Sequence, residues 1–383
     1  MKILYLEWNS IGAKDLEEAF LLEGHELIRY PIVMEETFKD PGFEKKLTFV
    51  LQKEKPDLMF SVDYFPIFSY FGMKEKIRYV SWVYDSPLRT LYSSMVTSPC
   101  NVICLFDRAL CMEFQEAGIS TVRYLPMAAN TLRLDSIVRD VPAASFNCDV
   151  SFVGSFYVEG GSPFDQMAAA LPEYARGYLD GVTAAQMKIQ GYDFVEEVLG
   201  PVIEELEKAY PMEALPSIRE SREHFYGQFV INRRITSVER MELLTAVSKT
   251  RKVDVFTKYR DFSLPNLHNR GPVDYYKEMP LVFKQSRINL NISRRGLKSG
   301  IPLRAFDIMG SGGFLLSNFQ ADFLEHFVPE EDFVYYESKE DLVQRAAYYL
   351  DHDKERQEIA ENGHNKVAAA HTYRHRVREM LNF

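Results

Sequence analysis

The sequence lacks several features that would assign a protein to a class at once. Its four cysteines, Cys100, Cys104, Cys111 and Cys148, form no CxxC pair, so neither a zinc site nor a disulfide framework is expected. No stretch approaches the roughly 18–20 apolar residues of a membrane span. The apolar run within Met1–Glu7 is too short for a signal peptide. We therefore expect reduced, buried thiols, no transmembrane segment and a cytoplasmic protein.

Other absences argue against particular classes of ligand. No GxGxxG follows the first apolar run, so an NAD site is unsupported. The net charge of -10 disfavours a nucleic-acid partner, because binding a duplex needs a basic face. The run Asp351–Asp353 has the spacing of a metal-binding carboxylate pair, but it lies in a charged stretch between two helical patterns, and a helix cap is expected there instead. We expect no metal site, and we find no internal repeat.

What is present is a regular alternation of strand and helix patterns. The chain has 383 residues, a length that suits two domains. Short apolar runs separated by helical stretches predict parallel sheets covered on both faces. The predicted strands are residues 3–6, 25–30, 58–62, 79–84, 102–106 and 122–125 in the first half, and 149–154, 253–256, 288–292, 314–316 and 333–336 in the second.

This pattern predicts an α/β protein with two parallel-sheet domains. We place an N-terminal domain at residues 1–145 and a C-terminal domain at 146–370, interrupted by a helical insertion at about 160–250. A final helix at 371–383 is expected to pack back on the N-terminal domain. The insertion is open to more than one interpretation, since it could shape the acceptor site, form the contacts of a homodimer, or do both.

Polar and glycine residues collect directly after the predicted strands. In open parallel sheets ligands bind beyond the carboxyl ends of the strands, so these positions are candidates for a site. Each residue alone also fits an ordinary loop or a helix cap. The positions are Asn9, Ser10, Gly12, Asp63, Asp85, Asp107, Gly154, Ser155, Lys258, Ser293, Arg294 and Arg295.

The segment from Ser293 to Pro302 is the most informative of these loops. It contains Arg294, Arg295 and Lys298 together with two glycines, and a predicted helix begins directly after it. Glycine lets the backbone approach a ligand, a helix N-terminus favours anions, and arginine can grip phosphate oxygens. These features predict a diphosphate site, with a solvated basic loop as the alternative.

One turn into the following helix stands Asp307, whose carboxylate could accept hydrogen bonds from the two hydroxyls of a ribose. The run Met309–Phe314, with three glycines, is read as a tight helix-to-strand turn.

The run Gly300–Phe314 resembles the C-terminal signature of the CgeB-type (spore maturation) glycosyltransferases. The segments Ser81–Pro87, Leu105–Arg108 and Tyr124–Ala129 are similar to the N-terminal half of that group. The group is in turn similar to the large retaining family that carries a Glu-x7-Glu motif. In this sequence Ser299 falls on the first Glu of the motif and Asp307 on the second.

The resemblance implies the GT-B fold, in which two Rossmann-like domains face a central cleft, and it covers nearly the whole chain. It implies that the C-terminal half binds a nucleotide sugar, with a UDP-linked sugar expected, and that the N-terminal half binds the acceptor. It also implies catalysis without a metal or other cofactor. The donor-binding set is then Gly154, Ser155, Lys258, Arg294, Arg295, Lys298, Ser299, Arg304 and Asp307.

We therefore expect a hexosyltransferase-like enzyme acting on a glycan, a protein or a small molecule. Asp85 is the candidate for acceptor contact, and for a catalytic base if the enzyme inverts the configuration of the sugar; capping of the next helix is its structural alternative. Asn9, Ser10 and Gly12 are further acceptor-side candidates. Two other functions stay open: a sugar-nucleotide epimerase or phosphorylase on the same fold, and an inactive nucleotide-sugar-binding or structural protein of a spore or cell-surface assembly.

Overall fold

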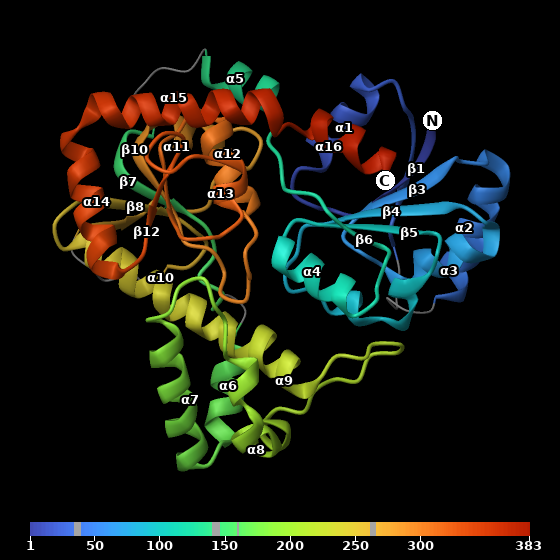
Figure 1. Ribbon diagram of the computed structural model, residues 1–383, viewed down its shortest axis with the longest axis horizontal. Coiled ribbons are helices and arrows are strands. Elements are labelled where there is room, and N and C mark those ends of the chain that lie inside the picture. The colour runs from blue at the N-terminus through green and yellow to red at the C-terminus, as the bar shows by residue number, and fades with distance from the viewer. Residues whose placement is uncertain (34–39, 140–145, 159–160, 261–265) are drawn as a thin grey trace. The chain divides into compact units, whose positions relative to one another are not determined.

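A computed structural model describes residues 1–33, 40–139, 146–158, 161–260 and 266–383. The predicted end of the N-terminal domain at residue 145, and the predicted start of the insertion at 160, lie outside these residues. The chain forms two compact units (Figure 1). The first comprises residues 1–128, 214–220 and 371–383, and the second residues 129–213 and 221–370.

The first unit is a parallel sheet of six strands in the order β2-β1-β3-β4-β5-β6, with helices on both faces. Its core is apolar and rich in aromatic rings, among them Phe68, Phe71 and Tyr79. The strands are β1 (Lys2–Glu7), β2 (Glu26–Pro31), β3 (Leu58–Val62), β4 (Arg78–Val83), β5 (Asn101–Leu105) and β6 (Val122–Tyr124). The helices are α1 (Ala13–Leu22), α2 (Pro41–Glu54), α3 (Pro66–Glu75), α4 (Arg108–Glu116) and α16 (Tyr373–Asn382), with 3-10 turns at Arg89–Tyr92 and Ser94–Thr97.

The last helix, α16, belongs to the first unit although it ends the chain. Arg374 and Arg378 both pair with Glu23, which directly follows α1, at 2.6 and 2.5 Å. Arg376 is buried and its Nε donates to the carbonyl oxygen of Pro126 at 2.7 Å. These contacts tie the C-terminus to the sheet that the N-terminus begins.

The second unit is also a six-stranded parallel sheet, in the order β12-β11-β10-β7-β8-β9. Its strands are β7 (Cys148–Val153), β8 (Val253–Phe256), β9 (Leu267–Asn269), β10 (Ser286–Asn291), β11 (Leu315–Asn318) and β12 (Val334–Tyr336). Its helices outside the insertion are α5 (Thr131–Arg139), α11 (Met279–Gln285), α12 (Leu303–Gly310), α13 (Phe323–His326), α14 (Lys339–Asp351) and α15 (Asp353–Ala370). Figure 1 shows α15 running across α11 and α12.

Between β7 and β8 the chain leaves the sheet and builds a helical bundle with its own apolar core (Figure 1). The bundle contains α6 (Pro163–Ala170), α7 (Glu173–Gln186), α8 (Ile203–Ala209), α9 (Arg222–His224) and 3-10 turns at Glu196–Val198 and Gly200–Val202. A π-helical segment, Phe225–Ile231, continues without a break into α10 (Asn232–Ser248), which returns to the sheet. We call residues 161–250 the insertion.

The expected parallel α/β class is confirmed, and each predicted strand has a counterpart within about two residues. The final helix predicted at 371–383 is α16, and two further helices, α14 and α15, precede it. Residues 131–139, which we assigned to the N-terminal domain, form α5 and group with the second unit. Outside the insertion, the sequence pattern also did not predict α3, α11, α13 and β9. No helix among the described residues has the length and apolar character needed to cross a membrane.

Candidate active site

The strand order of the second unit creates a point where the chain reverses direction across the sheet. From β7 the chain moves outward through β8 to β9, and it then returns to place β10 on the other side of β7. The loops after β7 and β10 therefore diverge from two adjacent strands. Such a reversal leaves a crevice at the carboxyl ends of the strands, where ligands of this fold class bind. Both loops were singled out in the sequence.

The loop after β7 begins with Gly154 and Ser155. The Gly154 amide donates to the Phe256 carbonyl oxygen at 3.2 Å, and a Cβ at Gly154 would lie 2.9 Å from the Phe152 ring. Glycine is required here because the backbone passes directly over that ring. Ser155 is exposed, and its hydroxyl accepts the amide of Tyr157 at 2.8 Å. Tyr157 itself has φ +59°, a left-handed conformation that is costly for a non-glycine residue.

A buried arginine from α10 joins the two loops. The Nε of Arg240 donates to the Ile292 carbonyl oxygen at 3.1 Å, and its Nη1 donates to the Ser155 carbonyl oxygen at 2.5 Å. Burial lowers the pKa of the Arg240 guanidinium, with the charge of Arg304 acting in the same direction. Arg240 was not among the predicted site residues, because a cation within a helical pattern is typical of a solvent-exposed face.

The two adjacent arginines of the loop after β10 differ in their surroundings. Arg295 forms a bidentate pair with Glu239 of α10, at 2.5 Å for Nη2 to Oε1 and 2.8 Å for Nε to Oε2. Both side chains are about nine-tenths buried, and the Arg295 amide also donates to the Thr236 hydroxyl at 2.9 Å. The charge of Arg295 is thus already compensated, and the residue anchors the loop. Arg294 lies toward Tyr157, with its guanidinium 5.8 Å from the ring centre.

The insertion holds the middle of this loop through a buried polar network. Gly296 has φ +91°, and a Cβ there would lie 2.1 Å from the Oε1 of Gln228. The side-chain amides of Gln228 and Asn232 donate to the same oxygen of Asp193, at 2.9 and 2.5 Å. Gln228 also donates to Glu196 at 2.6 Å. The insertion therefore sets the shape of the cationic loop.

The remaining donor-side candidates lie on either side of this centre. Lys258 follows β8 and is exposed. Lys298 is partly buried, within electrostatic range of Glu196. Ser299 is buried, and its carbonyl oxygen accepts the Asp322 amide at 3.0 Å. Two more candidates, Arg304 and Asp307, lie on α12.

The α12 residues pack against the segment that precedes β10. The Arg304 guanidinium stands 5.6 Å from the Phe283 ring centre and contacts the sulfur of Met279. Asp307 is 2% exposed, and its Oδ1 accepts the Tyr275 hydroxyl at 3.1 Å. The structure thus gathers Gly154, Ser155 and Arg294 around Tyr157, and it places Arg304 and Asp307 in a second group on α12.

In the first unit the acceptor-side candidates also lie at a reversal point of the sheet. The strands β1 and β3 are adjacent although β2 lies between them in sequence. Trp8 links the two strand ends, since its indole Nε1 donates to the Val62 carbonyl oxygen at 2.8 Å. Asn9 and Ser10 follow, and Gly12 is the N-cap of α1 with φ +77°.

Asp85 follows β4, the next strand along this edge, and is exposed. The 3-10 turn after it starts at Arg89 with Leu88 as N-cap, so Asp85 lies outside the cap that was its structural alternative. A buried neighbour, Asp63, accepts the amides of Tyr84 and Asp85 on one oxygen, at 2.8 and 3.1 Å. Burial, reinforced by the charge of Asp85, raises the pKa of Asp63 to about 7. Asp63 was among the residues predicted to follow a strand, but no role was predicted for it.

The carboxylates at the α14–α15 junction serve as ion-pair partners. Asp353, the first residue of α15, pairs with Arg287 at 2.6 Å and with Arg356 at 2.5 Å. These hydrogen bonds lower the pKa of Asp353 to about 2. Across the described parts of the chain, no group of three or more His, Cys, Asp or Glu residues is arranged to hold a metal.

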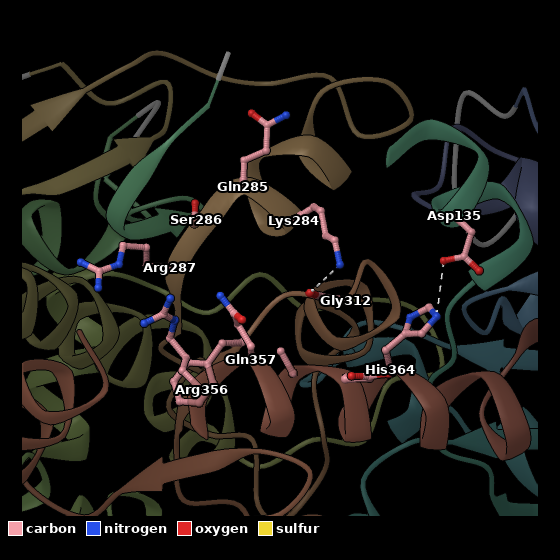
Figure 2. Close-up of a pocket in the computed structure, with 12 residues that line it drawn as sticks. Asp135, Lys284, Gln285, Ser286, Arg287, Gly312, Arg356, Gln357 and His364 are labelled. Atoms are coloured by element: carbon pink, nitrogen blue, oxygen red, sulfur yellow. Dashed lines mark hydrogen bonds and ion pairs between the residues drawn. The ribbon is translucent and has the colours of Figure 1, made fainter. Parts of the chain in front are cut away.

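A separate cavity of about 610 Å³ opens at the other edge of the second sheet (Figure 2). It is lined by the start of β10 and by one face of α15. His364 of α15 lies 3.4 Å from Asp135, and Lys284 donates to the Gly312 carbonyl oxygen at 3.4 Å. Since these groups lie at the amino ends of the strands, the cavity is distinct from the crevice described above.

The comparisons with known proteins agree with this architecture. Residues 233–382 match a family model described as "Glycosyl transferase-like". A comparison with curated protein sequences finds no significant match.

Three of the similar solved structures each cover 100% of this chain. A glycosyltransferase from Rickettsia africae has a TM-score of 0.54 and 11% identity, with 97% of that chain covered. Sucrose-phosphate synthase from Thermosynechococcus elongatus has a TM-score of 0.52 and 10% identity, with 98% of that chain covered. Anabaena Alr3699/HepE in complex with UDP-glucose has a TM-score of 0.51 and 8% identity, with 98% of that chain covered. At these identities the likeness shows the fold, and the fold is GT-B. The family match makes the C-terminal part of the chain similar to glycosyltransferases. The matched stretch runs from α10 to α16 and includes the cationic loop and α12.

Proposed function

We propose that the protein transfers a hexose from a UDP-linked donor to an acceptor, without a catalytic metal, and that it is a CgeB-type member of its class. The family match supports the reaction class. The UDP-glucose bound by the similar Anabaena protein supports the donor. The CgeB assignment rests on the run Gly300–Phe314. Four free cysteines support action in a reducing cytoplasm.

The observation that carries the proposal is the pair of loops, joined by Arg240, that flank the reversal point of the second sheet. Gly154 brings the backbone close to the crevice, and Arg294 and Lys298 supply positive charge beside it. In this proposal these groups and the N-terminus of α12 neutralise the diphosphate as it leaves. Arg295 acts indirectly, because its own charge is bound by Glu239.

Asp307 is proposed to accept the ribose hydroxyls. Its Oδ1 already accepts the Tyr275 hydroxyl, so the nucleotide would share or displace that contact. On the acceptor side, Asp85 is proposed as the base that takes the proton of the acceptor hydroxyl, with Asp63 holding the backbone of its loop. The acceptor hydroxyl oxygen forms the new glycosidic bond, and the bond to the diphosphate breaks.

A thermal-shift panel of UDP, UDP-glucose, GDP, ADP and TDP tests the donor site. A ligand at 100 times its dissociation constant adds about 2.7 kcal/mol to the free energy of unfolding, which such a measurement resolves. We expect the largest shift with the uridine nucleotides and a loss of that shift in Arg294→Ala and in Asp307→Asn. Tyr275→Phe is the control, because it removes the hydrogen bond to Asp307 and keeps the carboxylate. No shift with any nucleotide, for folded protein, would reject the donor site.

A further inference from the structure

A small cavity opens directly beside the two loops of the candidate donor site. It measures about 270 Å³, just under the size of pockets that hold drug-sized ligands. It therefore suits a single sugar ring rather than a nucleotide. Its principal lining residues are Tyr157, Tyr210, Phe225, Phe229, Arg233 and Arg294.

The cavity combines aromatic walls with two guanidinium groups. Tyr157 and Arg294 come from the loops after β7 and β10, and the other four residues belong to the insertion. Phe225 and Phe229 stack with their ring centres 6.1 Å apart. Flat aromatic faces pack well against the C–H faces of a sugar ring, and a few polar groups then fix its orientation.

Arg233 is the residue that this arrangement leaves unexplained. It is partly buried, its Nε donates to the Tyr157 carbonyl oxygen at 3.1 Å, and it makes no ion pair with any described residue. Its positive charge therefore stands at the cavity without compensation by a carboxylate of any described residue. The next residue, Arg234, shows the contrast, because it lies 3.9 Å from Asp165.

Tyr157 is the point where the surrounding cations converge. The guanidinium carbons of Arg240 and Arg294 lie 5.0 and 5.8 Å from its ring centre, and Arg233 binds its carbonyl oxygen. Its backbone is held in the left-handed region, with φ +59°. Such strain persists where surrounding contacts enforce it, often at ligand sites.

We propose that this cavity is a subsite for an anionic monosaccharide, a sugar ring that carries a carboxylate or a phosphate. The ring packs between the aromatic walls, and its anionic group binds Arg233, with Arg294 beside it. The planar guanidinium suits both anions, because it can donate two parallel hydrogen bonds. This inference rests on the proposed function, since the sugar is either the one carried by the donor or the one on the acceptor.

Calorimetric titration with matched charged and neutral sugars tests the subsite in the full-length protein. UDP-glucuronate is compared with UDP-glucose, and, in the presence of UDP, glucuronate and glucose 6-phosphate are compared with glucose. We expect the charged member to bind about tenfold more tightly in at least one of these sets. A preference confined to the UDP-linked pair assigns the subsite to the donor sugar, and a preference among the free sugars assigns it to the acceptor.

Substitutions at Arg233 and Arg234 test which residue causes the preference for charged over neutral sugars. Arg233→Ala should abolish it, Arg233→Lys should keep part of it, and Arg234→Ala should leave it unchanged. The lysine variant and the wild-type comparison keep the test valid even if the alanine variant does not fold.

Equal binding of charged and neutral sugars, with UDP bound normally, would overturn the subsite and leave the proposed function standing. Loss of the preference in Arg234→Ala as well as in Arg233→Ala would also overturn it. If UDP does not bind, the proposed function fails. The free sugars then decide the subsite alone, and absence of a charge preference among them rejects it.

Discussion

Arg295 and Glu239 form a bidentate ion pair that fastens the loop after β10 to the helix α10. About nine-tenths of each side chain is shielded from water, so removing either charge would leave the other buried without a partner. Because α10 belongs to the insertion, a contact between side chains 56 positions apart joins the sheet to the helical bundle. The first prediction tests this contact.

Replacing Glu239 with Gln should lower the free energy of unfolding by about 3 kcal/mol, because it leaves a buried guanidinium without its carboxylate. Urea denaturation measures the change. Glu242→Gln on the same helix is the control. Glu242 lies 3.7 Å from Lys339 and both side chains are about half exposed, so its loss should cost less than about 1 kcal/mol. Equal losses in the two variants would contradict an anchoring role for the pair.

Replacing Gly296 with Ala should destabilise the protein by about 2 kcal/mol and weaken UDP binding, since the new Cβ would overlap the Gln228 amide. Gly271→Ala is a matched control. Gly271 has a similar φ of +82°, but no heavy atom lies within 4 Å of its added Cβ. It should show the backbone cost alone, roughly 1 kcal/mol, with UDP binding intact. Thermal unfolding with and without UDP gives both values, and weakened binding in both variants would argue against a specific role of the loop.

The stability of the first unit should depend on pH through Asp63. Its pKa is raised to about 7 in the folded protein, so the folded state holds the proton more tightly than the unfolded chain does. Stability is then lost as the pH rises from about 4 to about 7. Asp63→Asn keeps an oxygen for the two amides and has no charge to bury. Relative to wild type, its free energy of unfolding should rise across this window by up to about 4 kcal/mol.

Urea denaturation at several pH values measures the Asp63 effect, with Asp57→Asn, at an exposed carboxylate of the same unit, as control. A difference between Asp63→Asn and wild type that does not change with pH would show that Asp63 is ionised in the folded protein throughout.

Replacing Asp85 with Asn should lower kcat by about 100-fold or more if it is the base that accepts the acceptor proton. UDP binding should be unchanged, because the donor residues belong to the other unit. Transfer from UDP-glucose or UDP-glucuronate, measured as UDP release in the presence of acceptor, gives the rate. A variant with full activity would remove Asp85 from the mechanism.

The sheets could be predicted because their strands are continuous apolar runs. Leu58–Val62 is buried at all five positions, and it was predicted residue for residue. The edge strand β9 has three residues, of which Leu267 alone is buried, so no apolar run marks it. The helix α3 begins with Pro66 at its first position, but its many apolar residues give no helical periodicity.

The parts of the candidate site that lie in loops directly after strands could be predicted from the sequence. The parts that come from the insertion could not. The cationic loop was visible as charge and glycine in one segment. The partner of Arg295 was not, because Glu239 lies 56 residues away on another element. Arg233 and Arg240 look like solvated charges in a helical pattern. Their roles depend on which face of α10 turns toward the sheet, and that follows from tertiary packing.

The π-helical segment continues without a break into α10, so the side chains of both segments belong to one continuous helix. One side of this continuous helix carries Gln228, Asn232, Thr236 and Glu239, because these residues recur every three to four positions. All four face the same loop, and Arg233 stands next to them at the neighbouring cavity. A rotation of this helix would therefore displace the anchors of the loop and the wall of the cavity together. The same helix packs on the sheet through Leu243, Leu244 and Val247, so the cationic loop and the neighbouring cavity share one structural support.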